Sequence, residues 1–263
     1  MKGWLTRLLH AAAPPIVTFL GFILVWDVAV RYWRVPAYQV PPPAKVLNAM
    51  VEHWRQLAEA TLLTAAGAGA GFVLSLVAGT LIAFAFSQSA IVRRGFYPYA
   101  ILLQTVPIVA VAPLIIRWFG YGFQSVVVVA FMLGLFPIIT NVTTGLTRLD
   151  PNLVDLFAVY NARWHQVLLK LRVPGAIPYL VSGAKISCGL SVIGAIVGEV
   201  FAGIGSQRFG LGYLIMLSAE QLKTDYAIAA VFCSTLLGMS VFGIVNLIGS
   251  SVLWRWQGAP LDR

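Results

Sequence analysis

Six apolar runs, each long enough to cross a bilayer, constrain what this sequence can fold into. A helix with a rise of about 1.5 Å per residue needs roughly 20 residues to cross about 30 Å of hydrocarbon. The runs cover approximately residues 12–33, 61–87, 97–118, 123–146, 175–204 and 225–253. The chain is 59% hydrophobic and only 10% charged, which is the composition of a protein whose main solvent is lipid. The sequence therefore predicts an all-α, polytopic membrane protein with about six transmembrane helices.

The basic residues between these runs predict the orientation of the protein in the membrane. If the N-terminus lies inside, the inner segments carry ten Lys and Arg residues and the outer segments carry seven. Basic loops favour the cytoplasm, and an even number of spans returns the polypeptide to the side on which it starts. We therefore expect both termini to be cytoplasmic.

The remaining composition argues against two other classes of protein. Although the net charge is +9, Lys and Arg are scattered singly or in pairs between apolar blocks, and no basic stripe forms. This distribution argues against a nucleic-acid partner. Cys188 and Cys233 both lie inside apolar runs, which favours buried free thiols over a disulfide or a metal site. We expect the lipid bilayer as the environment, and no metal or other cofactor.

One segment, residues 148–174, differs from the apolar runs. Its first 25 residues carry six charged side chains, a concentration well above that of the whole sequence. Asp150 followed by Pro151 is typical of a helix N-cap followed by the first helical position, so a helix is predicted to start there. Asn161 tolerates the left-handed conformation that ends many helices. The first helix is therefore predicted to end at this residue.

A second short helix is predicted over about residues 162–171, with Pro174 ending it. Each helix would have about ten residues and a length of roughly 15 Å, which is half of a bilayer. Both helices therefore lie on the cytoplasmic face as an amphipathic hairpin. The hairpin is either a docking surface for another protein or a membrane-surface element that packs on its own spans. The residues alone leave both interpretations open.

The spacing of this segment resembles the cytoplasmic EAA loop in the membrane subunits of bacterial ABC importers. The pattern D-x5-N-A-x11-P begins at Asp155 and ends at Pro174. The family pattern is E-A-A, then Gly, then a distant Pro. Residues 155–157 read D-L-F in place of E-A-A, and Asn161 stands in place of the glycine.

The resemblance extends over roughly residues 45–255. The stretches LLQTVPIVAVAPLIIRWFGYG, FPIITNVTTGLTRLDPNL and GLSVIGAIVGEVFAG, followed by GLGYLI, are similar to the nitrate, sulfonate, taurine and thiamine-precursor branch of these permeases. The resemblance implies a permease of the type I ABC importer class, with residues 1–263 forming a single transmembrane domain. It also implies a location in the bacterial plasma (inner) membrane.

The resemblance further implies three protein partners. Two copies of the chain would form a homodimer, each copy would bind a cytoplasmic ABC ATPase subunit, and a substrate-binding protein would dock outside. The implied coupling residues are Asp155, Leu156, Phe157, Tyr160, Asn161, Ala162 and Pro174. The sequence contains no G-x4-G-K-[ST] phosphate loop, so ATP and Mg²⁺ are expected on the ATPase and the chain itself is not expected to be an enzyme.

Candidates for the translocation path lie where prolines interrupt apolar runs, because carbonyls freed in a bilayer face protein or a water-filled cavity. They are Gln104, Thr105, Pro107, Pro113, Thr140, Asn141 and Glu199. For each hydroxyl, the alternative is a hydrogen bond to its own helix. An acid within an apolar run is costly and usually functional. Glu199 is either part of the path or its gate, or an interfacial anchor.

The permease interpretation predicts import of a small polar solute, either a nitrate-, sulfonate- or taurine-type anion or a pyrimidine precursor of thiamine. One alternative is an ion-coupled carrier that works without an ATPase, for which Glu199 and Asp27 are the available acids. Another alternative is an intramembrane enzyme. The sequence lacks an H-E-x-x-H pair, a G-x-S-x-G elbow and a pair of intramembrane aspartates, which argues against the enzyme.

Overall fold

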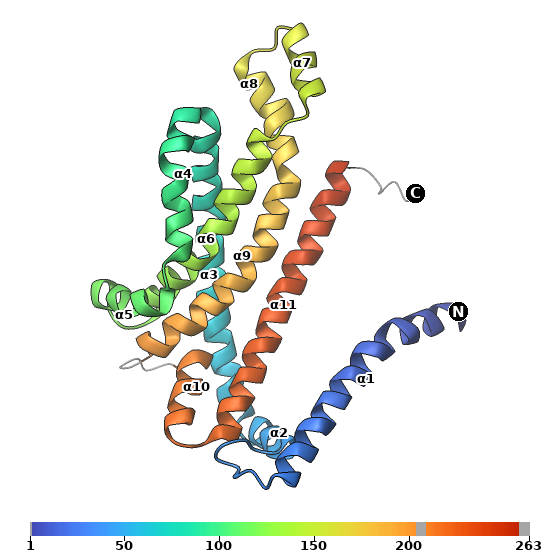
Figure 1. Ribbon diagram of the computed structural model, residues 1–263, viewed down its shortest axis with the longest axis vertical. Helices are drawn as coiled ribbons and strands as arrows, with labels where there is room; N and C mark the ends of the chain where they lie inside the picture. The colour runs from blue at the N-terminus through green and yellow to red at the C-terminus, as the bar shows by residue number, and fades with distance from the viewer. Residues whose placement is uncertain (1, 204–208, 258–263) are drawn as a thin grey trace. The chain divides into compact units, whose positions relative to one another are not determined.

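The computed structural model describes residues 2–203 and 209–257. Within these ranges the regular elements are all helical, which confirms the predicted all-α class (Figure 1). Their bounds are α1 Lys2–Tyr32, α2 Pro43–Glu52, α3 Trp54–Gln88, α4 Ala90–Thr105, α5 Ile108–Phe119, α6 Phe123–Thr147, α7 Pro151–Val159, α8 Trp164–Val167, a π-helix Leu168–Arg172, α9 Val173–Ala202, α10 Leu211–Glu220 and α11 Thr224–Gln257.

Four helices in the described part of the protein are long and apolar enough to cross a membrane. They are Trp54–Gln88, Phe123–Thr147, Trp164–Ala202 and Thr224–Arg255. The predicted runs at 61–87, 123–146 and 225–253 lie within them, and the run at 175–204 extends past the third. The predicted run at 12–33 coincides with most of α1, a helix of 31 residues.

The predicted third span, 97–118, is wrong as a single helix. The structure divides this run into α4 and α5, which have 16 and 12 residues. Val106 between them has an extended backbone, with φ −66° and ψ 122°. A residue before proline is disfavoured in the helical region, and Pro107 has no N–H to continue the helical ladder. Both effects place the break at Val106 and Pro107.

The helices fall into two compact units. One unit contains residues 1–58 and 214–232. In it, the Thr224 hydroxyl donates to the Tyr38 carbonyl, and the Tyr226 hydroxyl donates to Gln56 Oε1 at 3.2 Å. The Tyr226 ring also lies 4.7 Å from the His53 ring, measured between centroids. That the protein forms a single permease domain stays a prediction.

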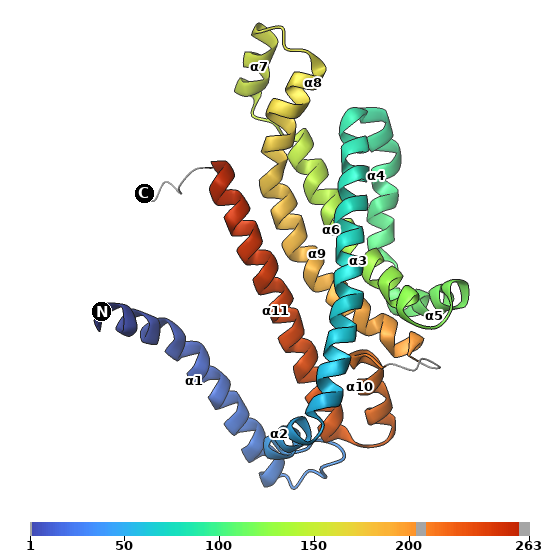
Figure 2. The same cartoon turned by 180° about the vertical axis from the view of Figure 1, so that it is seen from behind.

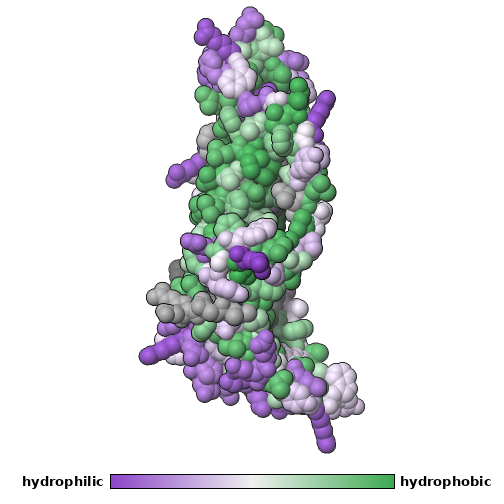
Figure 3. Space-filling view, turned by 90° about the vertical axis from the view of Figure 1, so that its left-hand side faces the viewer, coloured by the Kyte–Doolittle hydropathy of each residue, from purple (hydrophilic) through white to green (hydrophobic). Residues whose placement is uncertain are grey.

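The other unit contains residues 59–213 and 233–263, and α6 packed against α9 forms its centre. The two helices run side by side in both views (Figures 1 and 2). Hydrophobic residues cover the middle of this unit on the face that carries α4 and α5, whereas hydrophilic residues gather at the end formed by α7 and α8 (Figure 3). This distribution is the one expected for a span with a hairpin outside the hydrocarbon.

Small residues allow α3, α6 and α9 to approach closely. Ala130 of α6 is fully buried. A Cβ built on Gly194 of α9 would lie 2.7 Å from the Ala130 Cα, and one built on Gly71 of α3 would lie 2.8 Å from the backbone nitrogen of Phe131. Contacts this short leave no room for a side chain. Close backbone approach through small residues is a main source of helix association in membranes, because lipid removes the hydrophobic drive between helices.

Buried hydroxyls add hydrogen bonds between the same helices. The Ser187 hydroxyl of α9 donates to the Gly134 carbonyl at 2.7 Å. The Ser75 hydroxyl of α3 lies 2.8 Å from the Phe131 carbonyl. Each of these serines is fully buried. The bonds therefore tie both α3 and α9 to α6 without exposing a polar group to lipid.

The packing predicts a contrast between two glycines of α9. Gly194→Ala should lower the free energy of unfolding by about 1 to 3 kcal/mol, because the new methyl group meets the α6 backbone. Gly189→Ala is the matched control, since a Cβ at Gly189 meets no atom within 4 Å. It should be neutral or stabilising by up to about 1 kcal/mol. Thermal and denaturant unfolding in detergent would measure both. Equal stability of the two variants would contradict this packing.

Candidate functional site

The first helix of the hairpin begins where the sequence predicts. Asp150 has an extended backbone, and its carboxylate accepts a hydrogen bond from the Asn152 N–H at 2.9 Å. Pro151 occupies the first turn of α7, where no N–H is needed. The cap and the proline together fix the start of α7 directly after α6.

The turn after α7 is a Schellman motif, and Asn161 occupies its left-handed position. Asn161 has a φ of 48°. The Ala162 N–H donates to the Phe157 carbonyl at 3.0 Å, and the Asn161 N–H donates to the Ala158 carbonyl at 2.9 Å. These are the six-to-one and five-to-two bonds that define the motif. The predicted left-handed turn is confirmed, and it explains how asparagine can stand where the family pattern has glycine.

The second helix of the hairpin differs from the prediction, because it does not end at Pro174. It starts at Trp164, and the Arg163 N–H donates to Gln166 Oε1 at 2.8 Å. It then continues through the π-helix Leu168–Arg172 into α9, so Pro174 lies in the first turn of α9. The Val173 N–H bonds to the Leu168 carbonyl five residues back. Pro174 has no N–H to donate, and its ring would clash with the preceding turn of a regular α-helix. The wider π-helical turn changes the backbone hydrogen-bonding pattern just before the proline.

The hairpin leaves its apolar side chains exposed. No residue of α7 is buried. Leu156 is 48% exposed, Tyr160 is 77% exposed and Trp164 is 60% exposed. A hairpin that packed on its own spans would bury this face. Between α7 and α8 lies a groove of about 290 Å³, which is lined by Leu156, Phe157, Tyr160, Ala162, Gln166 and Lys170.

The path candidates on α4 and α5 are exposed. Gln104 and Thr105 lie in the last turn of α4, and Pro107 precedes α5. The Thr105 hydroxyl donates to the Leu102 carbonyl of its own helix at 2.8 Å. Pro113 is exposed within α5. For Thr105 the structure therefore shows the bond to its own helix that was the alternative interpretation.

The candidates on α6 are half-buried and surround the carbonyl of Pro137. The Asn141 amide donates to this carbonyl at 2.8 Å, and the Thr140 hydroxyl lies 3.2 Å from it and 3.1 Å from the Phe136 carbonyl. Gly183 of α9 faces the same turn, because a Cβ there would lie 3.0 Å from the Pro137 oxygen. Both side chains therefore donate hydrogen bonds to carbonyl groups of their own helix. Their role in a path stays a prediction.

Glu199 lies in a buried polar cluster at the far end of α9. Its side chain is 4% exposed. Its Oε2 accepts hydrogen bonds from the Thr64 hydroxyl of α3 and from the Gly212 N–H, each at 2.9 Å. The Leu211 N–H donates to the same Thr64 hydroxyl at 3.0 Å. The cluster therefore joins α3, α9 and the N-terminus of α10.

Two features stabilise the carboxyl group of Glu199 at this position. The Gly212 N–H in the first turn of α10 donates to it, and the positive end of a helix dipole favours an anion. Gly210 makes room for it, because a Cβ at Gly210 would overlap the carboxyl group. Oε1 has no hydrogen-bond partner among the described residues.

The structure does not gather all the path candidates into one group. Among the described residues, no hydrogen bond joins Glu199 to the candidates on α4, α5 or α6. Thr64 is absent from the residues predicted for the site, because nothing in its local sequence signals a partner that is 135 residues away. Asp27 of α1, the other acid considered for an ion-coupled carrier, forms an ion pair with Arg31 at 2.8 Å.

Comparison with known proteins identifies similar sequences over most of the protein. Residues 71–253 match the family described as binding-protein-dependent transport system inner membrane component. The sequence is 31% identical to the formylaminopyrimidine transport permease protein ThiX of Halalkalibacterium halodurans, over 94% of this chain and 97% of that protein.

Two further relatives are similar along their lengths. The riboflavin transport system permease protein RibX of Chloroflexus aurantiacus is 29% identical, over 92% of this chain and 90% of that protein. The putative aliphatic sulfonates transport permease protein SsuC of Bacillus subtilis is 28% identical, over 96% of this chain and 88% of that protein. The regions compared therefore extend over most of the chain, and the family match at residues 71–253 spans the hairpin and Glu199.

The polar cluster predicts a specific role for the Thr64 hydroxyl in stability. Thr64→Val removes a donor to Glu199 and the acceptor of the Leu211 N–H, which should lower the free energy of unfolding by about 1 to 3 kcal/mol. Thr64→Ser keeps the hydroxyl and should retain most of the stability. Thr80→Val is the control on the same helix, because the Thr80 hydroxyl bonds to the Leu76 carbonyl of its own helix. Unfolding in detergent would be measured for all three, and an equal loss for Thr64→Val and Thr80→Val would contradict the cluster.

Proposed function

This chain belongs to the family of binding-protein-dependent transport system inner membrane components, and we propose that its α7–α8 hairpin couples it to a cytoplasmic ATPase subunit. The protein is a permease subunit of an ATP-driven importer, and the comparisons confirm the resemblance to the sulfonate and thiamine-precursor branch. They do not support a carrier that works alone.

The exposed apolar face of the hairpin carries this proposal. Leu156, Tyr160 and Trp164 are exposed on the hairpin, and the hairpin forms the hydrophilic end of its unit (Figure 3). Because contiguous exposed apolar side chains outside the bilayer mark interaction sites, a protein partner is the favoured occupant. The capped start of α7 and the Schellman turn hold these side chains in one arrangement. The hairpin is therefore a preformed docking surface.

The other partners follow from the family. The sequence contains no phosphate loop, so ATP and Mg²⁺ belong to the ATPase subunit. A substrate-binding protein delivers the solute on the opposite side, and two copies of this chain form the membrane unit. In this arrangement the hairpin lies in the cytoplasm. The modest excess of basic residues on the same side as the hairpin supports this orientation.

The solute is a small polar molecule, and a pyrimidine-type heterocycle is the first candidate. Relatives with similar identities are named for formylaminopyrimidine, riboflavin and aliphatic sulfonates. The path candidates offer amide and hydroxyl groups, on Gln104, Thr140 and Asn141, and none of them is a cation. Such groups suit an uncharged heterocycle better than an anion. Identification of the ligand retained by the companion binding protein would decide between the two solute classes.

The left-handed turn predicts how substitutions of Asn161 affect coupling. Asn161→Gly should keep transport, because glycine adopts positive φ without steric cost. Asn161→Val should cost about 1 to 2 kcal/mol of local strain, because a β-branched residue is disfavoured at this φ. The spans should still fold, but the variant should retain less ATPase or uncouple hydrolysis from transport. Co-purification and ATPase assays with and without loaded binding protein would measure this.

A matched control uses the other asparagine of the hairpin. Asn152 is exposed and has a helical backbone in α7, so Asn152→Val should retain the ATPase almost as well as the parent. Equal retention and equal stimulation for Asn161→Gly and Asn161→Val would show that the hairpin is a passive surface element. The docking assignment would then be abandoned.

The division of labour between subunits predicts that this protein alone does not hydrolyse ATP. Purified without any partner, it should show no ATPase activity above a buffer control, because it lacks the backbone cradle and the lysine that hold the phosphates. After the cognate ATPase is added, the complex should hydrolyse ATP at a rate that responds to loaded binding protein. Hydrolysis that persists after all co-purifying subunits are removed would overturn the assignment.

A further inference from the structure

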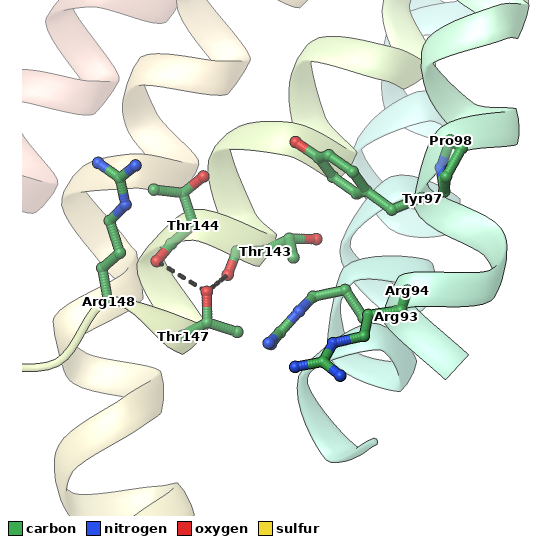
Figure 4. A pocket seen from close by; sticks show the side chains of 8 residues that line it. All are labelled: Arg93, Arg94, Tyr97, Pro98, Thr143, Thr144, Thr147 and Arg148. Atoms are coloured by element: carbon green, nitrogen blue, oxygen red, sulfur yellow. Dashed lines mark hydrogen bonds between the residues drawn. The ribbon is translucent and has the colours of Figure 1, made fainter. Parts of the chain in front are cut away.

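A positively charged cavity lies between α4 and α6, at the end of α6 that leads into the hairpin (Figure 4). Its volume is about 310 Å³. The residues that line it are Arg93, Arg94, Tyr97, Pro98, Thr143, Thr144, Thr147 and Arg148. None of these residues belongs to the coupling surface or to the path candidates described above.

The three arginines of the cavity lack a counter-charge. None of Arg93, Arg94 and Arg148 forms an ion pair with another described residue, and no acidic residue lines the cavity. The nearby Asp150 carboxylate already caps α7. Arg93 is half-buried, and Arg94 beside it is exposed. Like charges gathered at one cavity repel one another, and a bound anion relieves that repulsion. By contrast, Arg172 at the same end donates to the Ser87 carbonyl at 3.1 Å and is engaged within the protein.

Thr143 provides an independent observation at the same cavity. Its side chain is 4% exposed, and its hydroxyl has no hydrogen-bond partner among the described residues. In contrast, the Thr144 and Thr147 hydroxyls donate to carbonyls of α6 at 2.8 Å and 2.7 Å. The Thr143 hydroxyl points away from its own helix toward α4, on the side of Arg93 and Tyr97 (Figure 4). A buried hydroxyl without a partner is costly unless a ligand supplies the acceptor.

We propose that this cavity binds a phosphate-type oxyanion, held by Arg93 and Arg94 of α4 and by the Thr143 hydroxyl of α6, whereas the Arg148 side chain lies on the other side of α6 (Figure 4). Guanidinium groups match phosphate oxygens in a bidentate manner, and the hydroxyl adds one neutral donor. The source is either the headgroup of an anionic phospholipid or free phosphate. The position of the cavity at the end of the spans favours the lipid, because basic pockets between transmembrane helices bind anionic headgroups.

The site lies where α4 meets α6, next to the core cluster that contains Ala100 of α4 and Ile139 of α6. Arg93 and Arg94 lie near the start of α4, whereas Arg148 is the C-cap of α6 and lies two residues before the N-cap of α7. A bound oxyanion would therefore bridge the start of α4 and the C-terminal part of α6 that carries Thr143. Its assignment to the cytoplasmic leaflet rests on the proposed function, but its binding chemistry does not.

The test is a binding titration of the full-length protein in detergent. The probes are short-chain phosphatidylglycerol, short-chain phosphatidylcholine and inorganic phosphate, each followed by calorimetry and by native mass spectrometry. Phosphatidylglycerol should bind saturably, whereas phosphatidylcholine, whose ammonium group offsets its phosphate, should bind weakly. The double variant Arg93→Gln/Arg94→Gln should bind phosphatidylglycerol at least about tenfold more weakly, since two charge-assisted contacts are removed.

Matched variants separate this site from general electrostatic attraction. Arg117→Gln removes the same charge from the last turn of α5, outside the cavity, and should bind like the parent. Thr143→Val should weaken binding severalfold and Thr143→Ser should restore it. Thr147→Val should change little, because that hydroxyl already bonds to its helix. The threonine series also covers the case in which the double arginine variant does not fold.

Each outcome decides the proposal. Selective loss in the cavity variants for phosphatidylglycerol alone supports a lipid site, and the same loss for inorganic phosphate supports a free-anion site. Equal binding by the parent, the double variant and Arg117→Gln would overturn the proposal. None of these measurements involves ATPase or transport, so failure here is distinguishable from failure of the coupling assignment.

Discussion

The close approach of α6 to α9 and α3 is the constraint on which the rest of this unit depends. Ala130 lies between Gly71 and Gly194, where neither neighbour has room for a side chain. In lipid, such contacts associate helices through dispersion and short interhelical hydrogen bonds, of which the bond from Ser187 to Gly134 is one. Because α6 and α9 are also the two helices that enter and leave the hairpin, their packing sets the spacing of its two ends. A change in the spacing of the two ends of the hairpin would therefore require a change in the packing of α6 against α9.

The sequence predicted those parts of the site that depend on the backbone conformation of adjacent residues. Asp150 and Pro151 specify a helix start because the cap bond and the fixed proline φ involve adjacent residues only. Asn161 signals the left-handed turn for the same reason, since its φ of 48° is tolerated by very few side chains. The apolar runs likewise predicted the long helices, because bilayer thickness sets their length independently of their neighbours.

The parts that could not be predicted depend on distant partners or on a choice between alternatives. At Pro107 the helix is interrupted between α4 and α5. At Pro174 the helix continues, because a π-helical turn precedes the proline. A proline alone does not reveal which outcome the surrounding packing stabilises. Glu199 was recognisable as an unusual acid, but its partner Thr64 lies 135 residues away in an apolar run with no signal of its own. Pairing at that distance is decided by the fold.

The charge concentrated near the hairpin divides into groups with different physical roles. Asp150 caps α7, and Arg172 anchors the end of α3 through the Ser87 carbonyl, so both are accounted for by the fold. Arg93 and Arg94 have no ion-pair partner in the described part of the protein. A topology signal alone would explain basic residues at this end, because any exposed cation serves it. It would not explain why the buried Thr143 hydroxyl beside them also lacks an acceptor. A bound oxyanion would supply both a counter-charge for the arginines and an acceptor for the Thr143 hydroxyl. The topology signal accounts for the arginines alone.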